Sequence, residues 1–298
     1  MTKPIIDIVA PSMPCEPDIV RQCLHMIESW GFTPRYTIAE DSPQSPLGFY
    51  SETIRFQQLS DAIYAEDSDI IWALRGGYGL SPFADKLCQI PTPKRKKTFI
   101  GFSDNTALHV IATQQWNWQT VHGPVLFQAA TNLVTESILG QLSALLRGDL
   151  VETVIPALAL NEAAQTKRSI HTTVTGGNLS LLQTSIGTAW HVNCQHKILF
   201  IEEVNETGYR IDRILHHLRQ SGIFEGCQAL LVGDIDKSSD RTGEDLAPYV
   251  IDTWAQHLPF PVIRLPGFGH GKENGLLPFN RPCTLSLGET PTLTCLFQ

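Results

Sequence analysis

The sequence predicts an α/β protein whose first part is a parallel sheet covered by helices on both faces, followed by a second unit with more β structure. Through residues 1–150, short apolar runs alternate with amphipathic helical stretches, which is typical of a parallel sheet. Strand-like runs become more frequent toward the end of the chain. A length of 298 residues agrees with two domains.

The first half is interpreted as one domain, residues 1–150. The apolar run Ile5–Ala10 predicts a first buried strand, and Gly31 ends the helical stretch that follows it. The other expected elements are, in order, a helix at Phe56–Ala65, a strand at Asp69–Leu74, a short helix near Pro82–Cys88, a strand at Thr98–Phe102, a helix from Asp104 and a helix at Glu136–Arg147.

The second half is interpreted as a domain at residues 168–298, joined to the first by a linker at residues 151–167, where the hydrophobic pattern is weak. Its expected elements are a helical stretch with Leu181, Leu182 and Ile186, a strand at Lys197–Ile201, a helix at Tyr209–Gln220, a strand at Ala229–Val232, a helix at Asp245–His257, and strands at Val262–Leu265, Thr284–Leu287 and Thr292–Leu296.

Composition and charge exclude several classes of protein. With 42% hydrophobic and 17% charged residues, the chain can bury an ordinary globular core. The net charge of -8 argues against a nucleic-acid partner, and the basic cluster Lys94–Lys97 is interpreted as a solvated loop. The first apolar run is short and contains Asp7, so it is not a signal peptide, and no run is long enough to predict a membrane partner.

The cysteines and histidines give no sign of a disulfide framework or of a metal site. Seven cysteines are scattered along the chain without a C-x-x-C pair, which fits reduced thiols in the cytoplasm. There is no H-E-x-x-H motif, and cysteine and histidine do not cluster at ligand spacing. We therefore expect neither a metal nor a cofactor.

A serine stands where an expected strand passes into an expected helix. The run Thr98–Phe102 leads into Ser103, and the helical pattern begins directly after it. Such a turn exposes a hydroxyl for nucleophilic attack, and N–H groups at the helix start can hold an oxyanion. The glycine-rich turn Arg75–Gly79 follows the preceding strand, so both turns should open into one crevice. Because Asn105 stands where the G-x-S-x-G elbow has its last glycine, Ser103 could instead only cap the helix.

A nucleophilic serine also needs a base and a group that orients the base. His270 lies among three glycines after the expected strand Val262–Leu265, in a tight loop of the kind that often carries functional groups. Glu202 and Glu203 end an apolar strand, where alternation lets at most one of them face the crevice. The residues alone leave open that His270 has no catalytic role and, as the simpler interpretation of the glutamates, that they form an ordinary solvated strand end.

Several motifs occur together in one order. They are Arg75-Gly76-Gly77-Tyr78-Gly79, Gly101-Phe102-Ser103-Asp104, Gly176-Gly177-Asn178-Leu179 with Ile186-Gly187-Thr188, Ile201-Glu202-Glu203-Val204-Asn205-Glu206 with Tyr209-Arg210-Ile211-Asp212-Arg213, and Gly267-Phe268-Gly269-His270. In this order and spacing, the chain resembles the LD-carboxypeptidases, serine peptidases of murein recycling, from end to end. That family uses a G-x-S-D turn, which accounts for the missing elbow glycine. Gly208 departs from the proline common there, at a helix start where we expect no effect on chemistry.

The resemblance implies a catalytic triad of Ser103, His270 and Glu202. It also implies that the backbone N–H groups of Gly77 and Asp104 form the oxyanion hole, with no metal or cofactor. The implied fold is a flavodoxin-like N-terminal domain with a parallel sheet, plus a smaller C-terminal α/β domain rich in β structure. The implied assembly is a homodimer.

The reaction implied by the resemblance is hydrolysis of the L,D-amide bond that releases terminal D-alanine from a murein tetrapeptide in the cytoplasm. The His270 ring is then expected between Ser103 and Glu202. One alternative is a branch of the same family that cleaves peptidyl-adenylate antibiotics of the microcin type, although its members tend to be longer. Another is a non-catalytic binding module, since fold does not fix function.

Overall fold

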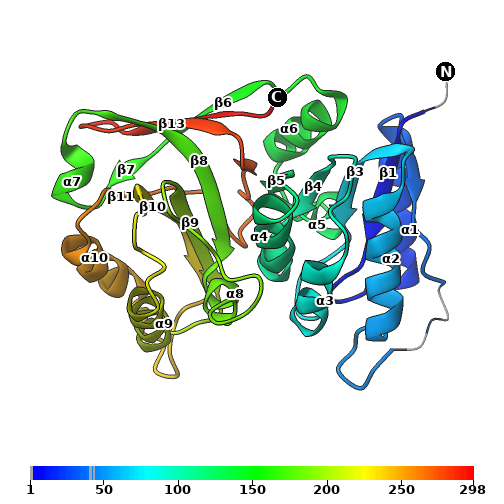
Figure 1. Cartoon of the computed structure of the whole chain (residues 1–298), viewed down its shortest axis with the longest axis horizontal. Coiled ribbons are helices and arrows are strands. Elements are labelled where there is room, and N and C mark those ends of the chain that lie inside the picture. The colour runs from blue at the N-terminus through cyan, green and yellow to red at the C-terminus, as the bar shows by residue number, and fades with distance from the viewer. Residues whose placement is uncertain (1–2, 40–41, 43) are drawn as a thin grey trace.

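The computed structural model describes residues 3–39, 42 and 44–298 and contains two β-sheets (Figure 1). The first two residues of the expected N-terminal domain lie outside the described residues. Each sheet is built mainly from one half of the chain, and the helices pack between and around the sheets. The carboxyl ends of strands from both sheets face the crevice that holds the predicted site.

The first sheet has the strand order of a flavodoxin-like domain. Its strands run in the order β5-β4-β3-β1-β2, all parallel, and β12 adds to β5 in the antiparallel direction. Their bounds are β1 (Ile5–Val9), β2 (Thr33–Arg35), β3 (Ser68–Ala73), β4 (Thr98–Gly101), β5 (Gln119–His122) and β12 (Leu277–Phe279). The predicted α/β class with a parallel N-terminal sheet is confirmed.

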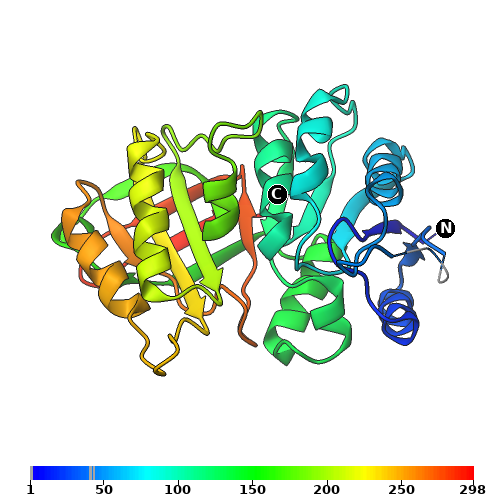
Figure 2. The same ribbon diagram turned by 90° about the horizontal axis from the view of Figure 1, so that it is seen from below.

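Helices cover both faces of the first sheet, as Figure 2 shows, with α2, α3 and α4 on one side and α1 and α6 on the other. Their bounds are α1 (Pro17–Ser29), α2 (Glu52–Tyr64), α3 (Ala84–Gln89), α4 (Thr106–Gln114), α5 (Leu126–Ala130) and α6 (Glu136–Arg147). Local sequence sets several ends. Pro17 begins α1, the Ser51 hydroxyl accepts a hydrogen bond from the Ile54 N–H, and Gly148 ends α6 in the left-handed conformation.

The second sheet has the order β6-β14-β13-β8-β9-β10-β11-β7, with a parallel centre from β8 to β11 and antiparallel pairs on both sides. Helices α8, α9 and α10 pack on one face. The bounds are β6 (Glu152–Pro156), β7 (Leu158–Ala159), α7 (Glu162–Gln165), β8 (Ser169–Asn178), α8 (Leu179–Thr184), β9 (Ile198–Val204), α9 (Gly208–Gln220), β10 (Ala229–Asp236), α10 (Ala247–His257), β11 (Val262–Arg264), β13 (Pro282–Ser286) and β14 (Thr292–Leu296).

The structure differs from the expected domain boundaries in two places. The segment 151–167, expected as a linker, forms β6, β7 and α7, and both strands pair within the second sheet. Its hydrophobic pattern is weak because β6 and β7 lie at the two edges of that sheet, where most of their side chains stay at least partly exposed. The chain also returns from its second half to add β12 to the first sheet.

One apolar core joins the two halves and fixes how they sit. It runs from residues such as Phe99 and Leu108 in the first half to Leu179 and Ile211 in the second. At its edge, the Thr106 hydroxyl at the start of α4 accepts a hydrogen bond from the Asn178 N–H at 2.9 Å. Gly177 has φ of 136°, and a Cβ there would overlap the Thr106 side chain. The second half is therefore packed directly against the turn that carries Ser103.

No helix in the described part of the chain is both long and apolar enough to span a membrane.

Candidate active site

Ser103 occupies a strained turn between β4 and α4. Its φ is 62°, which is unusual for a residue with a side chain and is typical of a nucleophile elbow. The glycines around it allow close packing that a larger residue would crowd. A Cβ on Gly76 would lie 3.1 Å from the Ser103 Cβ, and one on Gly101 would lie 3.2 Å from the Asn105 Cβ. The Asn105 side chain donates a hydrogen bond to the Phe102 carbonyl at 3.0 Å and so closes the turn where the standard elbow has glycine.

The structure brings Ser103, His270 and Glu202 into one chain of contacts. His270 Nε2 lies 3.2 Å from Ser103 Oγ, and His270 Nδ1 lies 2.9 Å from Glu202 Oε2. The Glu202 side chain is 0% exposed, whereas the His270 side chain keeps 18% exposure toward the crevice. The ring thus lies between the serine and the glutamate, with each ring nitrogen on one of them.

Electrostatics at His270 suit a base. Burial disfavours the charged ring, but the Glu202 carboxylate outweighs this, with help from Glu203 and Asp236, and raises the pKa of His270 above its usual value. In the tautomer that carries the ring proton on Nδ1, Nε2 is free to accept the Ser103 proton. This is the division of roles found in serine hydrolase triads.

The loop that carries His270 is held by two aspartates of β10. Asp236 Oδ2 accepts a hydrogen bond from the His270 N–H at 2.9 Å, and Asp234 accepts one from the Gly267 N–H at 3.1 Å. A Cβ on Gly269 would lie 2.8 Å from the Asp234 Cβ, so this glycine permits the close approach. Buried His122 packs in the core and contacts Asn274 of the same loop at 3.2 Å.

Glu203 points away from Glu202, as alternation along β9 requires. Its carboxylate accepts hydrogen bonds from the Asn178 side chain at 3.0 Å, the Ser180 N–H at 2.8 Å and the Ser180 hydroxyl at 2.7 Å. Burial raises the pKa of Glu203, and the neighbouring Glu202 adds to the shift. Glu203 therefore ties β9 to the first turn of α8.

The glycine-rich turn supplies the first predicted oxyanion donor. Gly77 has φ of 105° and lines the crevice together with Ser103. Among the described residues, its N–H has no hydrogen-bond acceptor. A Cβ at Gly77 would overlap Met13, so the turn keeps its shape only with glycine.

Asp104, whose N–H is the second predicted oxyanion donor, also has a structural role that sequence reasoning missed. Its buried carboxylate accepts hydrogen bonds from the Ser12 hydroxyl at 2.5 Å and from the Leu80 N–H at 2.9 Å. Burial raises the pKa of Asp104, against these hydrogen bonds. The side chain thus ties the nucleophile turn to the end of the glycine-rich turn.

Arg55 is a second residue that sequence reasoning missed. It is 1% exposed, and its guanidinium donates hydrogen bonds to the carbonyls of Tyr50, Pro11 and Gly79. Nothing in the helical pattern around Arg55 distinguishes it from a solvated arginine. Its position under the glycine-rich turn depends on contacts with residues up to 44 positions away.

The crevice is a cavity of about 520 Å³ between the two halves. Its walls include Ser103 and His270. Two exposed cations also line it, Arg75 from the first half of the chain and Lys237 from the second. In the described part of the chain, no group of three histidine, cysteine, aspartate or glutamate side chains could hold a metal ion.

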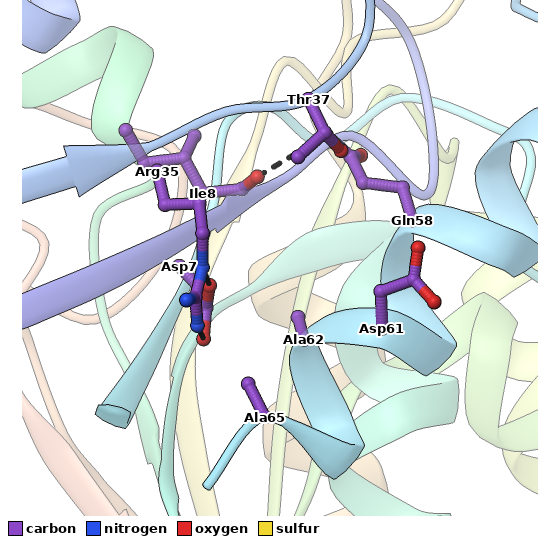
Figure 3. Close-up of a pocket in the computed structure, with 8 residues that line it drawn as sticks. All are labelled: Asp7, Ile8, Arg35, Thr37, Gln58, Asp61, Ala62 and Ala65. Carbon is purple, nitrogen blue, oxygen red and sulfur yellow. Dashed lines mark hydrogen bonds and ion pairs between the residues drawn. The ribbon is translucent and has the colours of Figure 1, made fainter. Parts of the chain in front are cut away.

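A second cavity, of about 200 Å³, lies between α2 and the strands β1 and β2 (Figure 3). Arg35 and Asp7 in its wall are paired with each other, whereas Asp61 accepts a hydrogen bond from the Gln57 side chain. Arg35 binds Asp7 at 2.5 Å and Asp67 at 2.9 Å. It contains no nucleophile with a nearby base, so we interpret it as a structural ion cluster.

The strained serine, the histidine beside it and the buried glutamate on a two-sheet α/β fold define the arrangement of a serine hydrolase. The chain belongs to the LD-carboxypeptidase family. The N-terminal domain of that family matches residues 6–123, and its C-terminal domain matches residues 171–285. The family indicated by the motifs is thereby confirmed.

Relatives agree with this assignment. A Rickettsia conorii protein with a provisional carboxypeptidase name is 37% identical over 231 residues, which cover 77% of this chain and 72% of the relative. The murein tetrapeptide carboxypeptidase of Pseudomonas aeruginosa is 23% identical over 292 residues, 94% of this chain and 92% of the relative.

Solved structures share the fold. The muramoyltetrapeptide carboxypeptidase of Oxalobacter formigenes is 24% identical, with a TM-score of 0.80 over 98% of both chains. An MccF-like protein of Bacillus anthracis is 21% identical, with a TM-score of 0.81 over 99% of this chain and 97% of the other.

Proposed function

We propose that the protein is a serine-type LD-carboxypeptidase that releases terminal D-alanine from murein tetrapeptides. The observation that carries this proposal is the contact chain Ser103–His270–Glu202 beside an open cavity, in a member of the LD-carboxypeptidase family. The likeness to the murein tetrapeptide carboxypeptidase of P. aeruginosa, which spans nearly the whole chain, supports the substrate class.

The reaction proceeds by acyl transfer. His270 Nε2 takes the Ser103 proton while Oγ attacks the carbonyl carbon of the scissile amide. The N–H groups of Gly77 and Asp104 hold the oxyanion, and Glu202 stabilises the imidazolium. His270 then gives its proton to the amine of the departing D-alanine. Water, deprotonated by His270, releases the acyl group and restores the free serine.

A second candidate is hydrolysis of a peptidyl-adenylate. MccF-like proteins have the same fold at similar TM-scores, and one from Streptococcus pneumoniae is described in complex with AMP. The same three residues would perform that chemistry with a different leaving group. The chain's 37% identical relative carries a carboxypeptidase name, which favours the peptide substrate.

One assay separates the candidates. Purified protein is incubated with a murein tetrapeptide and, in parallel, with a non-hydrolysable peptidyl-sulfamoyl adenosine as competitor, and D-alanine is measured. The proposal expects D-alanine release by the wild type and none by Ser103→Ala. Binding of the adenosine compound to the protein, measured by calorimetry, without any D-alanine release from the tetrapeptide would favour the second candidate. Binding of the tetrapeptide without turnover would favour a binding module.

We further propose that the enzyme acts as a homodimer in the reducing cytoplasm. All seven cysteines are free thiols, which supports a reducing compartment. Light scattering on the purified protein tests the dimer, since a monomeric mass at micromolar concentration would contradict it. Fractionation of the producing cells tests the compartment.

A further inference from the structure

Arg75 is an exposed cation whose side chain and backbone are both held by contacts with other parts of the first half. Its Nη1 donates a hydrogen bond to the Pro14 carbonyl at 3.2 Å, and its guanidinium lies over the Phe127 ring at 5.1 Å. Its carbonyl accepts a long hydrogen bond from the Asn105 side chain at 3.4 Å, which links the residue to the nucleophile turn. The guanidinium and the backbone carbonyl of Arg75 are therefore both held in place.

The charge on Arg75 has no carboxylate partner among the described residues. Some arginines of the chain do have one, whereas Arg55 is bonded to carbonyls instead. Arg35 binds Asp7, Arg95 binds Asp69, and Arg210 binds Glu206. A guanidinium has five N–H donors in a planar fork, of which the Pro14 carbonyl takes one and the Cys15 thiol engages another. Arg75 thus keeps donors and a full charge for a ligand in the cavity that it lines.

Arg75 is also adjacent to the reacting atoms. The next residue, Gly76, packs against Ser103, and Gly77 follows with its unpaired N–H. The terminal carboxylate of a carboxypeptidase substrate lies one residue beyond the scissile bond, within about 4 Å along the chain. A turn that holds the oxyanion at Gly77 can therefore hold that carboxylate at Arg75.

We propose that the Arg75 guanidinium binds the free carboxylate of the departing residue and so restricts the enzyme to peptides with an unblocked C-terminus. The carboxylate accepts two parallel N–H bonds from the fork of the guanidinium. This inference rests on the proposed function and adds the group that selects the substrate's end.

The test compares two substrates that differ only at the C-terminus. A murein tetrapeptide ending in D-alanine is compared with the same peptide ending in D-alaninamide, and kcat/KM is measured for both. We expect the wild type to prefer the free acid by about 10–100-fold, the usual size of a charged hydrogen-bonded contact. Arg75→Met removes this preference by slowing the acid alone, and Arg75→Lys retains part of it because charge remains without the fork.

Lys237 provides the matched control. It is the exposed cation of the other half that lines the same cavity, and no described side chain pairs with it. Lys237→Met should leave the acid-to-amide ratio at its wild-type value, whatever it does to the individual rates. An unchanged ratio in Arg75→Met, or a ratio that falls in Lys237→Met instead, overturns the assignment.

A binding measurement keeps this inference separate from the proposed function. In a Ser103→Ala background, calorimetry gives Kd for the acid and the amide with and without Arg75→Met. An Arg75-dependent preference for the acid, together with no D-alanine release by the wild type, would retain the subsite and reject the reaction. Equal binding of acid and amide would reject the subsite.

Discussion

Two clusters of buried charge in this molecule differ in how completely their groups are paired. In the cavity between α2 and β1, Asp7 binds Arg35, accepts a hydrogen bond from Ser68 and lies 3.5 Å from the buried ammonium of Lys97. In the crevice, Glu202 is equally buried, but among the described residues its only cationic partner is His270, a group that can lose its charge. The first cluster pairs carboxylates with an arginine and a lysine. The second pairs a carboxylate with a histidine ring that can lose its proton.

The comparison separates stability from chemistry. A fully paired cluster loses stability when one member is removed, because an opposite charge stays buried without a partner. The crevice cluster combines a strained serine with a titratable ring, and strain of this kind is typical of functional sites. Changes in the first cluster should therefore lower the free energy of unfolding, and changes in the second should lower the rate.

The largest effect is expected from Ser103→Ala. Removal of a triad serine typically lowers kcat by several orders of magnitude, about 10⁴-fold or more. Thermal unfolding should be nearly unchanged, because the substitution removes only the hydroxyl. D-alanine release and a thermal melt are measured on the same preparation, and retention of more than about a tenth of wild-type activity would break the comparison.

The two adjacent glutamates should differ next. Glu202→Gln leaves His270 without its charge partner, and kcat should fall by about 10³–10⁴-fold, the order seen when a triad acid is replaced by its amide. Glu203→Gln keeps an oxygen for Ser180 but weakens the contact with α8, so we expect a smaller loss of kcat. Steady-state kinetics give kcat for both variants. Equal losses of kcat would mean that Glu202 is not the residue that orients His270.

The paired cluster should respond in stability. Asp7→Ala leaves Lys97, whose side chain is 0% exposed, without its carboxylate partner. Breaking a buried pair in this way costs about 3–5 kcal/mol. Chemical denaturation should show this loss, while kcat per folded molecule stays close to that of the wild type. A stable but inactive Asp7→Ala protein would contradict the division between the clusters.

The smallest effect is a shift in pH dependence. Glu202 raises the pKa of His270 above 6.5, so the acid limb of kcat/KM should have its midpoint above that value, and activity should grow as pH rises through it. The stabilisation from His270 has the opposite sign. It is fully present below about 6.5 and is lost as pH rises through the folded pKa. Residual activity of Glu202→Gln should show the limb at lower pH, and an unmoved limb would mean that another group titrates.

The sequence predicted the parts of the site that are local. Ser103 and its turn, the glycine-rich turn, and the position of Glu202 at the end of a strand all follow from runs of fewer than ten residues. The order of the motifs then joined these parts through the family resemblance. The structure adds the contact distances, which no local pattern carries.

Long-range pairings could not be predicted in the same way. The Ser12–Asp104 hydrogen bond joins residues 92 positions apart, and Arg55 resembles any solvated helical arginine until its carbonyl partners are known. The strands within segment 151–167 were not expected from the sequence for a related reason. Strand β6 pairs with β14, near the end of the chain, and an edge strand with exposed side chains has little hydrophobic signal of its own.

The central claim is that Ser103 cleaves the bond to a terminal D-residue. The most direct measurement follows the release of alanine from two murein tetrapeptides, one ending in D-alanine and one in L-alanine, by the wild type and by Ser103→Ala. The account predicts release of D-alanine by the wild type alone and no release of L-alanine by either protein. Undiminished release by Ser103→Ala, or no release of D-alanine by a folded wild type, would contradict it.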